Sequence, residues 1–192
     1  MHRLNKIVVI GPESTGKSTL CEQLSVHYNT AWCKEYAREY LLKNGTDYTF
    51  DDLLTIAKGQ LQLEDEAIQQ VCGNTIPGES HSSQHPLLFI DTDMYVMKVW
   101  CEFVFDKCHP WILDQIVERK YDLYLLCNTD LPWVKDELRE YPDLESRQKL
   151  YTIYKDIMIN QPVSWVDISG SYEQRFEKAR AAVDALTGQR ET

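Results

Sequence analysis

The chain has 192 residues, enough for one domain with a sizeable core, and its 43% apolar and 26% charged residues are typical of a globular protein. The apolar runs are strand-sized, and no basic segment followed by an apolar one opens the chain, so we expect neither a membrane span nor a secretory signal. A net charge of −10 disfavours nucleic acid and anionic membranes as partners. Six cysteines without a C-x-x-C pair predict a cytoplasmic protein with most of its thiols in the core.

Short apolar runs alternate along the chain with longer segments of helical periodicity. Five strands are predicted, over Lys6–Ile10, Thr30–Cys33, Leu87–Ile90, Leu123–Cys127 and Ser164–Ile168. Helices are predicted over Ser18–Tyr28, Glu35–Lys43, Thr49–Gln70, Tyr95–Phe105, Trp111–Arg119, Trp133–Ile159 and Tyr172–Leu186. Residues 72–86 are rich in Gly, Ser and Pro and are expected to form a surface loop within the domain. Continuously apolar strands that alternate with helices predict an α/β fold, with a parallel sheet covered on both faces.

The strongest motif is GPESTGKS, Gly11 to Ser18, which matches G-x-x-x-x-G-K-[ST] at every fixed position. It follows a predicted strand and opens a predicted helix, as a phosphate-binding loop must. The two glycines allow backbone N–H groups to converge on a phosphate, Lys17 supplies a positive charge, and the Ser18 hydroxyl is a ligand for Mg²⁺. The motif predicts binding of ATP and Mg²⁺ by Gly11, Glu13, Ser14, Thr15, Gly16, Lys17, Ser18 and Thr19.

A second acidic element is expected beside this loop. Asp91 ends the predicted strand over 87–90, and ligands of open α/β sheets bind at the carboxyl ends of the strands. Asp91 could hold Mg²⁺ together with Ser18 or accept a proton from a substrate hydroxyl, and Asp93 is a further candidate on the substrate side. The alternative is that Asp91 caps the next helix and that Asp93 is solvated.

The segment KEYAREY, residues 34–40, follows the second predicted strand and reaches the same edge of the sheet. Glu35 and Arg38 could together bind and activate a hydroxyl-bearing acceptor, with Tyr36 beside them. A solvated helical ion pair between Glu35 and Arg38 is the alternative. Of the many aromatic residues, Tyr36, Tyr95 and Trp100 lie nearest to this site in the sequence and could stack on a flat ring, although each could equally belong to the core.

Residues 130–150 connect the fourth and fifth predicted strands and are the place for a mobile lid. Its arginines, Arg139 and Arg147, could stabilise charge on a transferring phosphoryl group and exclude water. The mixed charges of this segment fit a solvated helix face as well.

Taken together, these segments resemble the ribosylnicotinamide kinase domain of the NadR family. The resemblance is carried by GPESTGKST, KEYAREY, IAKGQLQLED, FIDTD and DLPWVKDELREYPD, and it extends over roughly residues 4–186. It implies a P-loop kinase with five parallel strands and a helical lid, which transfers a phosphoryl group from ATP to the 5′-hydroxyl of nicotinamide riboside. It also implies catalytic roles for Lys17, Asp91, Glu35, Arg139 and Arg147, and acceptor contacts from Glu35, Tyr36, Arg38, Asp91 and Asp93.

Full members of that family also carry a nucleotidylyltransferase domain, and from its length we expect this chain to be a single kinase domain, residues 1–192, without that partner. Two alternatives to a nicotinamide riboside kinase remain open at this stage. One is a regulatory ATP-binding or ATPase module without a small acceptor, and the other is a deoxynucleoside kinase. The sequence leaves the oligomeric state open.

Overall fold

The computed structural model describes residues 3–73, 86–138 and 141–188. Its sheet is built from strands β1 (Asn5–Ile10), β2 (Trp32–Cys33), β3 (Leu87–Asp91), β4 (Leu123–Cys127) and β5 (Trp165–Ile168). They lie in the order β2-β3-β1-β4-β5, and every neighbouring pair is parallel. The predicted fold is therefore confirmed, although β2 is shorter than the predicted strand over 30–33.

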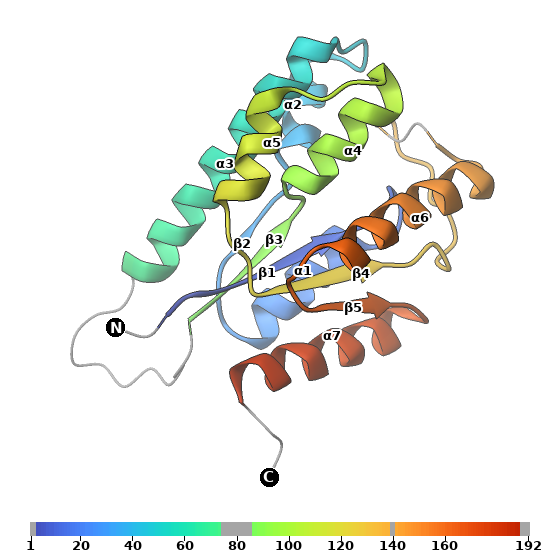
Figure 1. The fold of residues 1–192 in the computed structure, drawn as a ribbon. Coiled ribbons are helices and arrows are strands. Elements are labelled where there is room, and N and C mark those ends of the chain that lie inside the picture. The colour runs from blue at the N-terminus through green and yellow to red at the C-terminus, as the bar shows by residue number, and fades with distance from the viewer. Residues whose placement is uncertain (1–2, 74–85, 139–140, 189–192) are drawn as a thin grey trace.

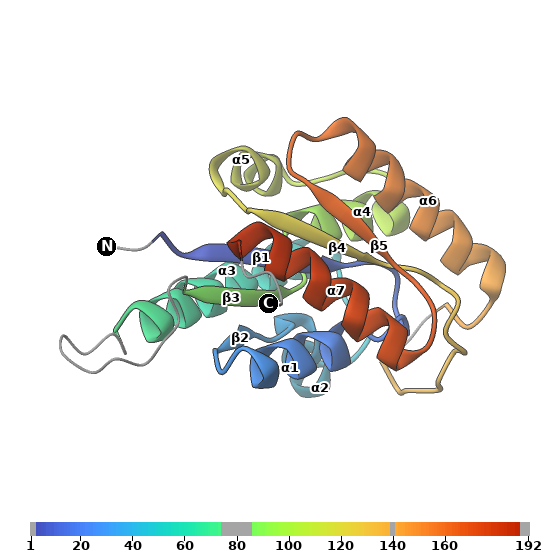
Figure 2. The ribbon, with the colours of Figure 1, turned by 90° about the horizontal axis from the view of Figure 1, so that it is seen from below.

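Helices cover both faces of this sheet (Figures 1 and 2). The helices are α1 (Lys17–His27), α2 (Tyr36–Asn44), α3 (Phe50–Gly73), α4 (Met94–Phe105), α5 (Pro110–Glu118), α6 (Leu144–Asn160) and α7 (Tyr172–Thr187). Successive residues of a strand point to opposite faces, so Ile7 and Val9 pack with α1 and α7, whereas Val8 and Ile10 pack with α4 and α6. The strands are buried on both faces, which explains their continuous apolar runs.

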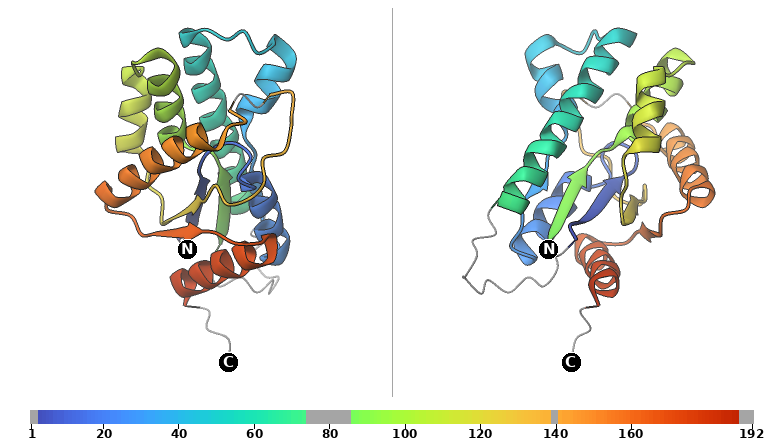
Figure 3. Two further views of the ribbon diagram at one scale, coloured as in Figure 1. Left: turned by 90° about the vertical axis from the view of Figure 1, so that its right-hand side faces the viewer. Right: turned by 60° about the vertical axis from the view of Figure 1, so that its left-hand side comes forward.

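A third core lies between the helices themselves. Side chains of α2, α3, α4 and α5 form a cluster that includes Leu53, Ile56, Met97 and Ile112, all fully or almost fully buried. In Figure 3 these helices rise together beyond one end of the sheet. This is the end at which the parallel strands finish, so the helical cluster and the strand ends enclose the region where a ligand is expected.

Two predicted boundaries are wrong. α3 continues to Gly73, so Cys72 and Gly73 are helical, while residues 74–85 of the predicted loop lie outside the described residues. The predicted helix over 133–159 begins only at Leu144, where the Asp143 side chain caps it by accepting from Ser146 N at 2.6 Å. Pro142 explains the delay, because a proline disfavours helical geometry in the residue before it.

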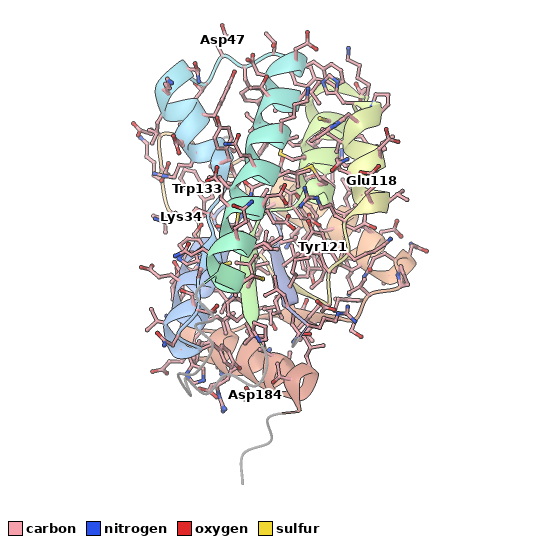
Figure 4. The ribbon with its side chains drawn as sticks, turned by 90° about the vertical axis from the view of Figure 1, so that its left-hand side faces the viewer. Lys34, Asp47, Glu118, Tyr121, Trp133 and Asp184 are labelled. Atoms are coloured by element: carbon pink, nitrogen blue, oxygen red, sulfur yellow. The ribbon has the colours of Figure 1, made fainter. Side chains whose placement is uncertain are left out.

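The acidic excess is visible at the periphery. Exposed carboxylates such as Asp47 and Glu118 lie at the rim of the molecule in Figure 4. None of the six cysteines, all of which lie in the described part of the chain, forms a disulfide, and Cys21, Cys33, Cys101 and Cys127 are buried as expected. None of the helices in the described part of the chain is both long and apolar enough to cross a membrane.

Candidate active site

The loop predicted to bind phosphate runs from the end of β1 to the start of α1. Gly11 has a φ of 138° and Gly16 a φ of 79°, positive values that favour glycine. Thr15 Oγ1 and Lys17 Nζ both donate to Pro12 O, at 2.7 and 3.0 Å. The loop is thus held by its own side chains in a wrapped conformation, with the N-terminus of α1 directed at its centre, which is the arrangement that binds a phosphate.

Asp91 is fully buried at the end of β3 and lies beside the start of α1. Ser18 Oγ donates to its Oδ2 at 2.5 Å, and its Oδ1 has no hydrogen-bond partner among the described residues. Burial, and then repulsion by Glu35, raise the pKa of Asp91 above its ordinary value, whereas Lys17 and the Ser18 hydrogen bond act in the opposite direction.

These two side chains fit the predicted Mg²⁺. The described residues contain no cluster of three or more His, Cys, Asp or Glu side chains that could hold a metal ion. Mg²⁺ does not require one, because it is commonly bound through one or two protein oxygens together with waters and substrate phosphates. A buried carboxylate oxygen without a partner, next to a hydroxyl, is the donor set that such an ion uses.

Glu35 stands at the N-cap position of α2, directly after β2. Thr92 Oγ1 donates to Glu35 Oε1 at 3.4 Å, which links α2 to the end of β3. Arg38, one turn into α2, does not form the alternative ion pair with Glu35. Its Nη1 lies instead 3.1 Å from Asp136 Oδ2, in the part of the predicted lid that precedes α6 and is called the lid segment below. Glu35 and Arg38 both line the cavity described below.

Two predicted substrate residues lie elsewhere. The Tyr36 ring packs against α3 so closely that a Cβ on Gly59 would lie 2.2 Å from it. Asp93 is buried and caps α4, with Oδ1 accepting from Tyr95 N at 3.0 Å and Oδ2 accepting from Tyr124 Oη at 2.9 Å. The alternative in which Asp93 is solvated is therefore wrong. Neither Tyr36 nor Asp93 lines the cavity.

A cavity of about 240 Å³ opens beside the phosphate loop. All nine residues from Gly11 to Thr19 line one half of it. The walls of the other half are apolar and aromatic and come from α2, α4, the lid segment and α6: Leu41, Val96, Val99, Trp100, Phe103, Leu138, Tyr141, Leu150 and Tyr154. Of the aromatic residues singled out in the sequence, Trp100 is the one that reaches this space. The phosphate loop, Glu35 and the apolar walls thus line one and the same cavity.

The lid segment is tied to the phosphate loop. Val134 N donates to Ser14 Oγ at 2.9 Å, and Tyr141 N donates to Glu13 Oε1 at 2.5 Å. Arg147 is buried, and its Nη2 donates to Ser14 O at 3.3 Å and to Leu131 O at 3.2 Å. Arg147 therefore holds the loop and the lid segment together rather than lining the cavity. Arg139, the other predicted lid arginine, lies outside the described residues.

Sequence reasoning missed Arg175, which supports the phosphate loop from α7. This buried side chain donates to Thr15 O at 2.9 Å and to Asn128 O at 2.8 Å, and it pairs with Asp130. Because Arg175 lies 160 residues from Thr15 in the sequence, no local pattern reveals the contact. The aromatic wall residues other than Trp100, which are Phe103, Tyr141 and Tyr154, were also missed, since helical periodicity does not distinguish a cavity wall from core.

A parallel sheet in this order, with a phosphate loop after its central strand β1 and a carboxylate at the end of the neighbouring β3, defines the chain as a P-loop protein with the fold of small-molecule kinases. A family model described as an AAA domain matches residues 6–175. The chain belongs to this family.

Curated relatives bear out the predicted resemblance to NadR. The trifunctional NAD biosynthesis/regulator proteins NadR of Escherichia coli (strain K12) and Salmonella typhimurium are each 27% identical over 188 residues. These matches cover 95% of this chain and 43% of each relative, so the chain spans less than half the length of the proteins that it matches.

Solved structures show the same fold. A crystal structure of NadR protein in complex with NR matches with a TM-score of 0.77 and 24% identity, over 98% of this chain and 51% of that one. A crystal structure of NadR protein in complex with NAD and AMP-PNP matches with a TM-score of 0.71 and 22% identity, over the same shares of the two chains. The structure of thymidylate kinase from Candida albicans matches with a TM-score of 0.64 and 16% identity, over 98% of this chain and 94% of that one.

Proposed function

We propose that this chain is a kinase that transfers the γ-phosphoryl group of ATP to the 5′-hydroxyl of a nucleoside-like acceptor, with nicotinamide riboside as the acceptor. The observation that carries the proposal is the single cavity in which a phosphate loop faces Glu35 and an aromatic wall. The likeness to NadR, including a solved complex with NR, supports this choice of acceptor. We further propose that the chain acts as one kinase domain in a reducing compartment, because its six cysteines include no C-x-x-C pair and form no disulfide.

The walls of the cavity favour an acceptor that carries no phosphate. A phosphate group is normally recognised by several cations or by bidentate arginines. In the described acceptor half the cationic side chain is Arg38, and Asp136 already pairs with it. Apolar and aromatic side chains such as Trp100 and Phe103 suit a flat ring instead. These contacts support a nucleoside rather than a nucleoside monophosphate as the acceptor.

The residues divide the chemistry between them. The backbone N–H groups of the loop and Lys17 would bind and orient the ATP phosphates. Mg²⁺, held by Ser18 and Asp91, would supply charge neutralisation at the β- and γ-phosphates. Glu35, oriented by Thr92, would accept the proton of the acceptor's 5′-hydroxyl. The 5′-oxygen would then form the new bond to the γ-phosphorus while the bond from that phosphorus to the ADP oxygen breaks. Glu35 suits this task better than Asp91 because it lines the cavity.

The proposal is tested by the rate of ADP release with Mg·ATP and a panel of nucleosides. Nicotinamide riboside should stimulate release most, and Glu35→Gln should lower this rate by about 100-fold or more while ATP binds with unchanged affinity. Glu39→Gln, an exposed position on the same helix, is the matched control and should behave as the wild type. Stimulation by thymidine or deoxycytidine instead would make the chain a deoxynucleoside kinase. Slow turnover that no nucleoside changes would refute the proposal and favour a regulatory ATPase module.

A further inference from the structure

Gln60 is a buried polar residue of α3 that the proposed chemistry leaves without a role. Its side chain is only 1% exposed and lies in the middle of the helix, facing the ends of β2 and β3. A core position of this kind is normally apolar, and a buried amide is costly unless both of its ends are hydrogen-bonded. The question is therefore which groups satisfy Gln60.

All of the partners of Gln60 belong to segments that carry the proposed site. Its Oε1 accepts from Tyr36 N at 2.7 Å, and its Nε2 donates to Lys34 O at 3.2 Å. These two groups lie on either side of Glu35 in the chain. The same Nε2 lies 3.3 Å from Asp91 O, the main-chain carbonyl at the end of β3, and 3.4 Å from Cys33 Sγ at the end of β2. One side chain thus joins the backbone on both sides of Glu35 to the backbone of Asp91.

Neighbouring contacts hold the same junction. Gly59 allows the Tyr36 ring to lie directly on α3, because any side chain there would collide with it. Thr92 follows Asp91 with a φ of 79°, unusual for a β-branched residue, and directs its hydroxyl to Glu35. Glu35 is therefore connected to the end of β3 in two ways: the Gln60 amide bonds to its neighbouring main chain, and the Thr92 hydroxyl bonds to its side chain.

We infer that Gln60 is a positioning residue, whose amide sets the placement of Glu35 relative to Asp91 by tying the start of α2 to the end of β3. The inference rests on the proposed phosphoryl transfer, in which these two carboxylates serve the acceptor and the metal. A fully satisfied buried polar network specifies one geometry, which an apolar side chain of equal volume does not. The bonds of Gln60 reach only one side of the site, so the phosphate loop should be unaffected by its loss.

The inference predicts a separation between catalysis and ATP binding. Gln60→Met keeps the volume of the side chain but removes the hydrogen bonds to Tyr36 N, Lys34 O and Asp91 O. We expect the rate of phosphoryl transfer, divided by the number of ATP sites measured calorimetrically, to fall at least about tenfold, with the Kd for ATP within about twofold of the wild type. Gln62→Met, the same change at an exposed position of α3, is the matched control and should leave both quantities unchanged.

A merely structural role gives a different result. If Gln60 only maintained folding, the rate and the number of ATP sites would fall in the same proportion, and the rate per site would equal that of the wild type, which overturns the inference. Gln60→Asn retains the amide on a side chain that is shorter by one methylene group. The rate per ATP site should fall in this variant as well, and this variant provides the test if Gln60→Met does not fold. A wild-type protein that no nucleoside stimulates would overturn the proposed function and this inference together, whereas a wild-type rate per site in an active enzyme would overturn this inference alone.

Discussion

The phosphate loop can form only if the residue at position 11 is a glycine. Its φ of 138° is accessible to glycine alone, and a Cβ there would lie 2.6 Å from Cys127 O, a main-chain atom that cannot rotate away. The same residue is the first fixed position of the sequence motif. The motif could therefore be recognised from the sequence, because each of its fixed residues is required either by the backbone conformation of the loop or by the charge of the bound phosphate.

This steric demand gives a prediction for Gly11→Ala. The new methyl group must displace either the loop or β4, so we expect ATP affinity to fall about 30-fold or more, which corresponds to about 2 kcal/mol. Isothermal calorimetry measures the affinity. Gly45→Ala is the matched control: its φ of 89° is also positive, but a Cβ there meets no described atom within 4 Å. The control should lose stability from its backbone strain and keep its ATP affinity. Equal affinities in the two variants would contradict the prediction.

Glu35 and Asp93 show which site residues the sequence could and could not assign. Glu35 could be placed at the site because it follows a strand, and strand ends are where α/β proteins bind ligands. Asp93 was assigned to the same site by the same rule, yet it lies two residues beyond the end of β3 and caps α4. The FIDTD pattern does not reveal which carboxylate points to the ligand and which to a helix terminus, because that depends on the path of the chain after the strand.

At the scale of helices, the cap of α4 should make stability depend on pH. Burial raises the pKa of Asp93 to about 7, despite its hydrogen bonds to Tyr124 and two backbone N–H groups. A pKa that is raised in the folded state means that folding favours the protonated carboxyl group. The stability from this group is therefore complete below the unfolded pKa, near 4, and is lost as the pH rises toward 7, by at most about 1.4 kcal/mol per pH unit.

Asp93→Asn removes this titration, and asparagine is an equally good cap. Urea titrations measure the free energy of unfolding. As the pH rises from 5 to 7, this free energy should fall in the wild type relative to Asp93→Asn. Asp143→Asn, at the exposed cap of α6, is the control. Hydrogen bonds from Ser146 lower the pKa of Asp143, so its contribution is lost only at more acidic pH, and its difference from the wild type should stay constant over this range. A constant difference for Asp93→Asn as well would contradict the prediction.

The lid segment is the element that the sequence described least well. Alternating charges predicted a continuous helix, but the backbone from Leu131 to Leu138 is irregular and is bonded to the phosphate loop, and α6 starts after Pro142. Charge patterns report solvent exposure and do not encode such contacts between distant segments. The order of strands and helices around this segment, between β4 and β5, was predicted correctly, and its role as a lid stays a prediction.

Arg147 should couple the lid to the phosphate loop. Arg147→Ala leaves the carbonyl groups of Ser14 and Leu131 without this donor, so we expect a loss of about 1–3 kcal/mol in unfolding free energy. A lid that is held less firmly should admit water, which raises the ratio of ATP hydrolysis to phosphoryl transfer. Lys155→Ala, at an exposed position on α6, should change neither quantity. If the ratio in Arg147→Ala equals that of the wild type, the proposed lid function is wrong.

At the scale of the whole molecule, the site exists because three structural units meet at the carboxyl ends of the strands. The sheet supplies the phosphate loop and Asp91, helices α2, α4 and α6 supply most of the apolar wall, and the lid segment adds Leu138 and Tyr141. The sheet could be predicted because its strands are continuous apolar runs that alternate with helices. Of the wall, only Trp100 was named from the sequence. Phe103 and Tyr154 could not be predicted, because they come from helices whose packing depends on the complete fold.

The most direct test of the proposed reaction is the identity of its product. Purified protein is incubated with Mg·ATP and nicotinamide riboside, and the product is analysed by mass spectrometry and phosphorus NMR. We predict one nicotinamide mononucleotide for each ADP released, with the phosphorus bonded to the 5′-oxygen, and no product from the 5′-deoxy analogue of the riboside. Release of ADP together with inorganic phosphate, at the same rate with and without the riboside, would contradict the assignment of this chain as a nucleoside kinase.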